Sequence, residues 1–185
     1  MSKVNASTTR DRILDALQDL VIAEGPSAVT LEAVAAAAGV SKGGLLYHFP
    51  SKAAMMSGLV RRLADRAEDD FRAAAESDEG IVRHYLRTSQ PESVEEAELY
   101  WSVIAALRGK DGTAGEDRGV IGGVFSEWGR LLHAEVPDPV LAEIIRLVGD
   151  GLYLSRIAGL PDADPDVVRR IIDRLAAEAE AARGR

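Results

Sequence analysis

The sequence predicts an all-α fold with about nine helices. Apolar residues recur at three- and four-residue spacings along most of the chain, as they do on one face of a helix. The strict alternation of a half-buried strand is almost absent, and glycine and proline separate the periodic segments. The 185 residues are enough for one ordinary domain, or for two small ones that share a core.

Four helices are expected in the first 76 residues, each preceded by a residue that can cap its N-terminus. Serine and threonine are good caps because their side-chain oxygen accepts a hydrogen bond from a free backbone N–H of the first turn. The cap candidates are, in order, Thr8 or Thr9, Thr30, Ser41 and Ser51. The first three helices stop at Gly25-Pro26, at Gly39 and before Pro50.

Five further helices are expected in the rest of the chain, separated by breaker residues. The stretch GKDGTAGED (109–117) combines glycines with charged residues and is predicted to be a loop. The expected helices span about 79–88, 93–109, 116–135, 138–159 and 165–182.

Composition limits the classes of function. The chain has no cysteine, which excludes disulfides, a thiolate nucleophile and a cysteine zinc site. No apolar run reaches the ~20 residues that span a bilayer, and residues 1–12 lack a signal-peptide core, so we expect a cytoplasmic protein with no membrane partner. The net charge is −8, yet residues 1–62 carry seven Lys or Arg and only five Asp or Glu. This weakly basic segment could approach a polyanion that the acidic remainder would repel.

Two short helices joined at Gly39-Val40-Ser41 have the spacing of a helix-turn-helix. Gly39 can supply the positive-φ residue of the turn, and Ser41 can cap the second helix. In such a motif the second helix enters the DNA major groove with its N-terminal residues against the bases. That helix would be KGGLLYHF (42–49), whose two glycines cost about 1 kcal/mol each as helix formers but allow close backbone approach.

The segment TLEAVAAAAGVSKGGLLYHFPSKAAM (30–55) strongly resembles the DNA-binding region of TetR-type (tetracycline-repressor-like) transcriptional regulators. The resemblance implies an operator-binding domain over residues 1–50 and a ligand-sensing and dimerisation domain over 51–185. It also implies phosphate or base contacts by individual residues of the motif. The implied DNA-binding residues are Thr30, Ser41, Lys42, Gly43, Gly44, Tyr47, His48 and Lys52.

Several of these residues also have a purely structural interpretation. Thr30 and Ser41 could be helix caps alone, and His48 could be a structural histidine. Tyr47 could belong to the core instead of contacting phosphate. Phe49 is expected to be a core residue, and Leu45 and Leu46 are expected to be core or near-core residues.

The last two helices suggest a dimer interface. Residues 138–159 are apolar on nearly all faces, which is typical of a helix buried on all sides. Small residues also recur there at four-residue spacing and would permit close helix approach. Two helices from each of two subunits would form a four-helix interface, although an internal core pair is the alternative. The expected interface residues are Leu147, Gly151, Ser155, Gly159, Val168, Ile172 and Leu175.

Most of the aromatic residues lie between residues 71 and 153, where they could line an apolar pocket for a small molecule or simply form core. The resemblance places an inducer pocket in this region. Phe71, on the helix expected after Ser51, would then connect the pocket to the DNA-binding segment. The expected ligand-binding residues are Phe71, Tyr85, Tyr100, Trp101, Ile104, Phe125, Trp128 and Tyr153.

These features predict a ligand-responsive, sequence-specific transcriptional regulator. As a homodimer it would bind palindromic double-stranded operator DNA, and as a repressor it would release that DNA when a small-molecule effector binds. The alternatives are a helical protein-interaction module, or a constitutive or activating regulator. An enzyme is not expected, because the three histidines are scattered and no nucleophile, phosphate-loop or metal motif is present; no metal or cofactor is expected either.

Overall fold

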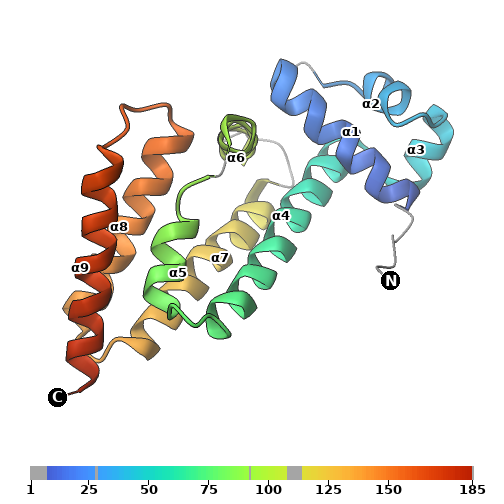
Figure 1. Cartoon of the computed structure of the whole chain (residues 1–185). Coiled ribbons are helices and arrows are strands. Elements are labelled where there is room, and N and C mark those ends of the chain that lie inside the picture. The colour runs from blue at the N-terminus through green and yellow to red at the C-terminus, as the bar shows by residue number, and fades with distance from the viewer. Residues whose placement is uncertain (1–7, 28, 92, 108–113, 185) are drawn as a thin grey trace, which may run out of the picture. The chain divides into compact units, whose positions relative to one another are not determined.

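The computed structural model describes residues 8–27, 29–91, 93–107 and 114–184. This part of the chain contains nine helices and no strand, which confirms the all-α prediction (Figure 1). The helices are α1 (Thr9–Glu24), α2 (Leu31–Ala37), α3 (Lys42–His48), α4 (Lys52–Ala75), α5 (Ile81–Thr88), α6 (Val94–Leu107), α7 (Ala114–Glu135), α8 (Pro139–Ile157) and α9 (Pro165–Arg183).

The predicted caps hold the ends of the first four helices. Thr8 forms a capping box with Asp11, in which each side chain bonds the other residue's backbone N–H. The hydroxyls of Thr30, Ser41 and Ser51 each accept a bond from the N–H three residues on, at 3.0–3.1 Å. The starts of these helices are therefore fixed by contacts within four residues.

One loop prediction was partly wrong. Residues 114–117 of the stretch expected to be a loop form the first turn of α7, while residues 109–113 lie outside the described part. Glu116 and Asp117 favour this turn because carboxylates are stabilised at the positive end of a helix. Asp117 is also buried and accepts a hydrogen bond from the Ser57 hydroxyl at 2.7 Å.

The chain divides into two compact units. Unit 1 comprises Met1–Leu63 and Glu98–Val120, and unit 2 comprises Ala64–Ala97 and Ile121–Arg185. Helices α4, α6 and α7 each contribute residues to both units. The functional boundary expected at residue 50 concerns DNA and ligand binding and stays a prediction.

Each unit has its own buried side chains. In unit 1 they come mainly from the segment that holds α1 to the first part of α4, and Leu99 and Val103 of α6 are buried as well. Arg62 of α4 also donates to Asp15, Gln18 and the Leu14 carbonyl of α1. In unit 2 the core joins the end of α4 to α5, α7, α8 and α9, and α5 packs against both α8 and α9. No helix in the described residues is both long and apolar enough to cross a bilayer.

Candidate functional site

Helices α2 and α3 form the helix-turn-helix that the sequence predicts. Gly39 has φ +65°, in the left-handed region that glycine occupies without strain, and its N–H bonds the Ala36 carbonyl. The Val40 N–H then bonds the Ala35 carbonyl at 3.0 Å, which closes the turn before Ser41 caps α3. Buried Leu45 and Phe49 hold α3 against the unit 1 core, as expected. The expectation for Leu46 was wrong: it is exposed, because the face of α3 that Leu45 occupies is the one packed on the core.

The opposite face of α3 is open. Tyr47 is 85% exposed, so it is not a core residue, and its ring touches His48 edge-on with 5.2 Å between ring centroids. Thr30, Ser41, Lys42, Gly43 and Tyr47 are exposed, whereas Gly44, His48 and Lys52 are partly buried. All eight predicted DNA-binding residues therefore lie at or near the surface.

The two glycines of α3 differ in how far the fold needs them. A Cβ built on Gly43 would meet only the Ser41 hydroxyl oxygen, at 4.0 Å, whereas one on Gly44 would crowd the same atom at 3.2 Å. That hydroxyl caps α3 by accepting a hydrogen bond from the Gly44 N–H, so Gly44 has a use within the fold. Gly43 has none, and the small surface it leaves on α3 is open to a partner.

Two lysines of this surface have partners within the protein. Lys42 Nζ forms an ion pair with Glu32 Oε1 at 2.7 Å, and this hydrogen bond lowers the pKa of Glu32. Lys52 Nζ donates to the Val29 carbonyl at 2.6 Å, just before α2. The sequence pattern does not indicate Glu32, because a side-chain contact across ten residues leaves no periodic pattern. The pattern does not indicate Arg10 either, whose guanidinium lies 5.0 Å from the Phe49 ring centroid.

The predicted ligand-binding residues fall into three groups. Phe71, Tyr85 and Trp128 form one aromatic cluster in unit 2, with Phe71 and Tyr85 each 5.0 Å from Trp128 between ring centroids. Phe125 and Tyr153 form a second pair at 5.9 Å. Tyr100, Trp101 and Ile104 lie on the part of α6 that belongs to unit 1.

Polar groups surround the aromatic cluster. Tyr85 Oη donates to the Arg146 carbonyl at 3.0 Å and contacts Asp150 Oδ1 at 3.2 Å, and burial together with the Asp150 charge raises the pKa of Tyr85. His84 is buried beside Trp128, and its Nε2 lies 2.7 Å from Asp70 Oδ1. The cluster is thus an apolar centre with polar groups at its edge.

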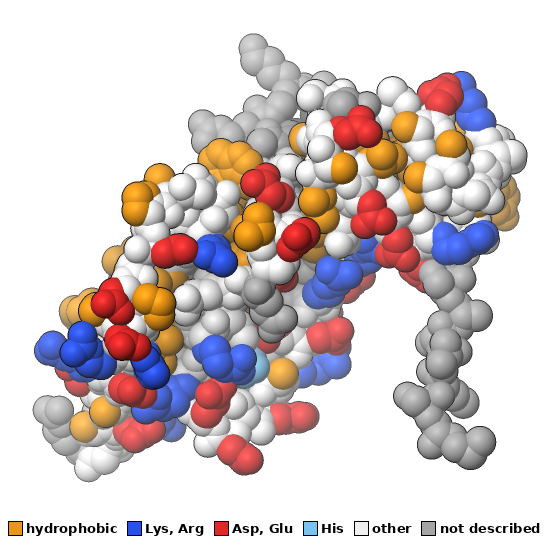
Figure 2. Space-filling model, turned by 45° about the horizontal axis from the view of Figure 1, so that its top comes forward, with side chains coloured by type: hydrophobic (Ala, Val, Ile, Leu, Met, Phe, Trp, Pro, Cys, Tyr) orange, Lys and Arg blue, Asp and Glu red, His pale blue; other side chains and the backbone are white. Residues whose placement is uncertain are grey.

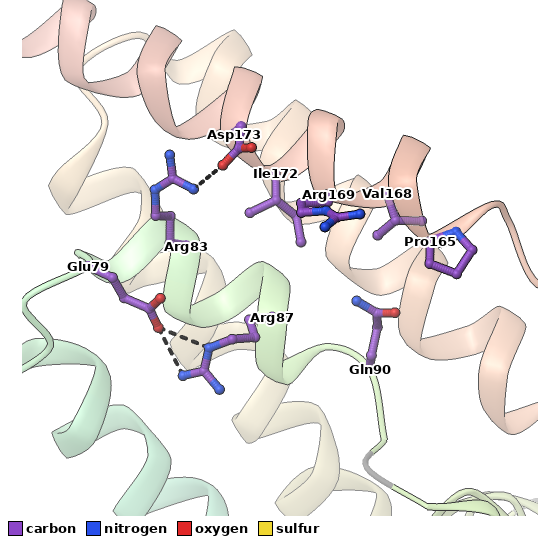
Figure 3. A pocket seen from close by; sticks show the side chains of 9 residues that line it. All are labelled: Glu79, Arg83, Arg87, Gln90, Pro165, Val168, Arg169, Ile172 and Asp173. Carbon is purple, nitrogen blue, oxygen red and sulfur yellow. Dashed lines mark hydrogen bonds and ion pairs between the residues drawn. The ribbon is translucent and has the colours of Figure 1, made fainter.

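A separate groove of about 350 Å3 lies between α5 and α9 (Figure 3). Val168 and Ile172 contribute apolar surface to it, and its arginines already have acidic partners. The ion pairs are Arg83–Asp173, Arg87–Glu79 and Arg169–Asp166. None of the aromatic residues expected to bind a ligand lines this groove.

The predicted interface residues are unequally exposed in the single chain. Val168 and Leu175 of α9 are buried, and Leu175 belongs to the core of unit 2, whereas Ser155 and Ile172 are partly buried. On α8 and just after it, Leu147, Gly151 and Gly159 are exposed. Figure 2 shows one face of the molecule, on which hydrophobic side chains are exposed among charges of both signs.

The α8 helix buries one face and exposes another. Its buried face includes Leu141, Ile145 and Gly149. After Pro139 the exposed positions are Val140, Ile144, Leu147, Gly151 and Leu154, which alternate four- and three-residue steps. That spacing is the one that helices use to pack against each other along a seam.

Known families match both parts of the chain. Residues 13–59 match the family described as bacterial regulatory proteins, tetR family. Residues 79–180 match the tetracyclin repressor-like C-terminal domain. The second match alone covers more than half of the chain.

Curated relatives match over a shorter stretch. The chain is 35% identical over 79 residues to the HTH-type transcriptional regulator AlkX of Mycobacterium tuberculosis, covering 43% of this chain and 37% of that protein. It is 35% identical over 66 residues to the HTH-type transcriptional regulator SrpR of Pseudomonas putida, covering 36% and 31%. The matched stretch thus spans only about a third of these relatives' length.

Solved structures match over nearly the whole chain. The multidrug binding protein EbrR complexed with malachite green has a TM-score of 0.69 and 27% identity, covering 90% of this chain and 96% of that one. The ethidium complex of EbrR has a TM-score of 0.64 and 27% identity, covering 91% and 98%. A member of the TetR family from Streptomyces coelicolor has a TM-score of 0.69 and 26% identity, covering 90% and 97%. With both family matches and the exposed α3 surface, this chain belongs to the TetR family of DNA-binding transcriptional regulators.

Proposed function

We propose that the protein is a repressor that binds a palindromic operator as a homodimer and releases it when a small molecule binds the helical body. The observation that carries the DNA-binding half is Gly43 on α3. It costs about 1 kcal/mol in helix stability, and the fold makes no use of its missing side chain, because a Cβ there would meet only the Ser41 hydroxyl oxygen at 4.0 Å. Such a locally unfavourable choice is expected at a working surface, here one that DNA must approach closely.

A hydrogen-bonding surface surrounds Gly43. Thr30 and Ser41 are exposed at the starts of α2 and α3, where their hydroxyls cap the helices and can also donate to a phosphate. Tyr47 adds an exposed hydroxyl donor further along α3. We assign Thr30, Ser41 and Tyr47 to phosphate contacts that position α3, and Lys42 to the base edges.

The exposed face of α8 supports the homodimer. A second copy would bury the exposed apolar and small residues of α8, which are in unfavourable contact with water in the single chain. Two α3 helices related by a two-fold axis would bind half-sites about one DNA turn apart. The interface assigned here uses Leu147, Gly151 and Gly159 rather than the buried Val168 and Leu175.

The aromatic cluster supports an aromatic effector. Phe71, Tyr85 and Trp128 offer ring faces and edges within one apolar centre, and His84 and Asp150 supply polar groups at its margin. EbrR, which has a similar fold, has been solved with malachite green and with ethidium. We propose a planar aromatic effector for this chain and use these two dyes as probes.

Selection of duplexes from a random pool with the purified protein tests the proposal. We expect a palindromic site, bound by a dimer and released by one of the two dyes. Enrichment of a non-palindromic site would contradict the dimeric arrangement. Dye binding that tightens the complex would instead indicate a ligand-activated binder.

Gly43→Ala separates a DNA-contacting glycine from a structural one. The added Cβ would lie 4.0 Å from the Ser41 hydroxyl oxygen, an ordinary van der Waals distance, and alanine is the better helix former. We therefore expect the variant to be more stable by up to about 1 kcal/mol. We expect its operator affinity to fall at least tenfold, because the methyl group blocks close approach. Gly123→Ala on α7, where a Cβ would have no neighbour within 4 Å, is the matched control and should leave operator affinity unchanged. Equal operator affinity of the two variants would overturn the role of Gly43.

A further inference from the structure

Carboxylates neutralise half of the cations in the DNA-binding head, here defined as residues 8–62. Arg61 pairs with Glu116, and Arg62 pairs with Asp15. The third ion pair joins Lys42 to Glu32. The other three Lys or Arg side chains of the head are in none of these ion pairs: Arg10 lies over the Phe49 ring, Arg12 donates to Thr9 and Lys52 donates to the Val29 carbonyl.

The Lys42–Glu32 pair stands apart because it lies on the DNA-facing surface. Lys42 is the first residue of α3, and Glu32 is in the first turn of α2, two residues after the Thr30 cap. Their side chains are 56% and 64% exposed, so DNA can reach both. A carboxylate therefore lies within hydrogen-bond distance of the one lysine on the recognition helix.

The Lys42–Glu32 ion pair affects binding to non-specific DNA and binding to the operator differently. Non-specific binding is driven by cations that neutralise phosphates and release counterions, and a closed Lys42–Glu32 pair contributes none. If Lys42 turned to a phosphate, it would exchange one anionic partner for another and leave Glu32 facing a polyanion. A guanine offers two acceptors in the major groove, O6 and N7, so a matching base can compete with Glu32 for Lys42.

We infer that Glu32 is a specificity-determining residue, which withholds Lys42 from the phosphates of non-cognate DNA and releases it at the operator. This inference rests on the proposed operator binding by α3. Glu32 thereby weakens non-specific binding more than it weakens operator binding.

Glu32→Gln tests the inference by removing the charge and keeping the side-chain shape. Affinity is measured by fluorescence anisotropy for the selected operator and for a scrambled duplex, at salt concentrations from 50 to 200 mM. The matched control is Glu24→Gln, which removes the same charge from the exposed C-terminal end of α1. Thermal melts establish that both variants are folded.

Each phosphate neutralised adds about −0.9 to the slope of log affinity against log salt. Freeing Lys42 in both subunits should therefore steepen the scrambled-duplex slope by about 1.8. That change corresponds to about a 12-fold larger loss of non-specific affinity between 50 and 200 mM salt. Glu24→Gln should leave the slope unchanged, and adding Lys42→Gln to Glu32→Gln should restore the original slope.

The inference would be overturned if Glu32→Gln and Glu24→Gln gave the same slope. It would also be overturned if the steeper slope of Glu32→Gln survived the loss of Lys42. The scrambled-duplex measurements need no operator, so they test Glu32 even where the selection finds no palindrome. An absent palindrome would count against the proposed function, whereas an unchanged slope counts against Glu32 alone.

Discussion

The Tyr85 ring occupies the space that a side chain at position 149 would fill. A Cβ built on Gly149 would lie 2.5 Å from Tyr85 Cζ, far inside van der Waals contact. Tyr85 cannot easily move aside, because it is buried and its hydroxyl is bonded to the Arg146 carbonyl. Helices α5 and α8 therefore meet closely only because residue 149 is glycine.

Gly149→Ala should destabilise the protein. Overpacking typically costs 1–3 kcal/mol, and the better helix propensity of alanine returns about 1 kcal/mol, so we expect a net loss of up to about 2 kcal/mol in the free energy of unfolding. Urea unfolding followed by circular dichroism measures it. Gly123→Ala, with open space at its Cβ, should be neutral or stabilising, and a similar loss in both variants would refute the close contact.

Tyr85→Phe should destabilise the fold by about 1 kcal/mol at neutral pH, because the Arg146 carbonyl and Asp150 lose a donor. The effect should shrink at high pH. Burial, with the Asp150 charge, raises the pKa of Tyr85 above its ordinary value of 10.0, so above about pH 10 the phenol ionises in the unfolded chain while staying protonated in the fold. Wild-type stability then falls as pH rises, and the phenylalanine variant lacks this contribution. Parallel urea unfolding of both proteins between pH 8 and 11 measures the difference; a gap that widened with pH would contradict the assignment.

Leu147→Glu should prevent dimerisation. Leu147 is 56% exposed in the middle of the row of exposed α8 residues, and a charge buried there against a second copy would lack a partner. Light scattering coupled to size exclusion should show a monomer whose operator affinity falls at least a hundredfold, because the two half-sites are no longer linked. Val94→Glu replaces an exposed apolar residue on α6 and serves as the control, which should remain dimeric. A dimeric Leu147→Glu protein would place the interface elsewhere.

Lys52→Ala should affect both stability and DNA binding. The loss of the bond to the Val29 carbonyl should cost about 1 kcal/mol, since that bond fixes the segment leading into α2. An ammonium has three donors, so Lys52 can hold this carbonyl and still contact a phosphate. We therefore expect weaker binding to every DNA sequence and a salt slope smaller by about 0.9 per subunit. An altered sequence preference would contradict a phosphate role, and Lys52→Arg, which keeps the charge, should keep the slope.

The sequence predicted the helix-turn-helix well because its determinants are local. Thr30 and Ser41 each bond an amide three residues away, and Gly39 closes a turn within the same few residues. Such contacts depend on chain geometry that the sequence order already specifies. The elements that carry the residues proposed to contact DNA could therefore be predicted before their surroundings were known.

Exposure was harder to predict. Tyr47 had both a core and a surface interpretation, and only the packing of Leu45 and Phe49 beneath α3 leaves Tyr47 85% exposed. The apolar residues of α8 suggested burial on every side, yet the single chain covers only one face of that helix. Periodicity gives the faces of a helix but not the number of neighbours that cover them.

The order of residues was enough to predict about nine helices, the caps of the first four, the turn at Gly39 and the family. Contacts between residues further apart in the chain became visible only in the folded protein: Ser57 with Asp117, Tyr85 with Gly149, and Lys42 with Glu32. The two kinds of feature differ in their range along the chain. Caps and turns close within a few residues of backbone, whereas these contacts depend on how whole helices pack and on the rotamers that packing leaves open.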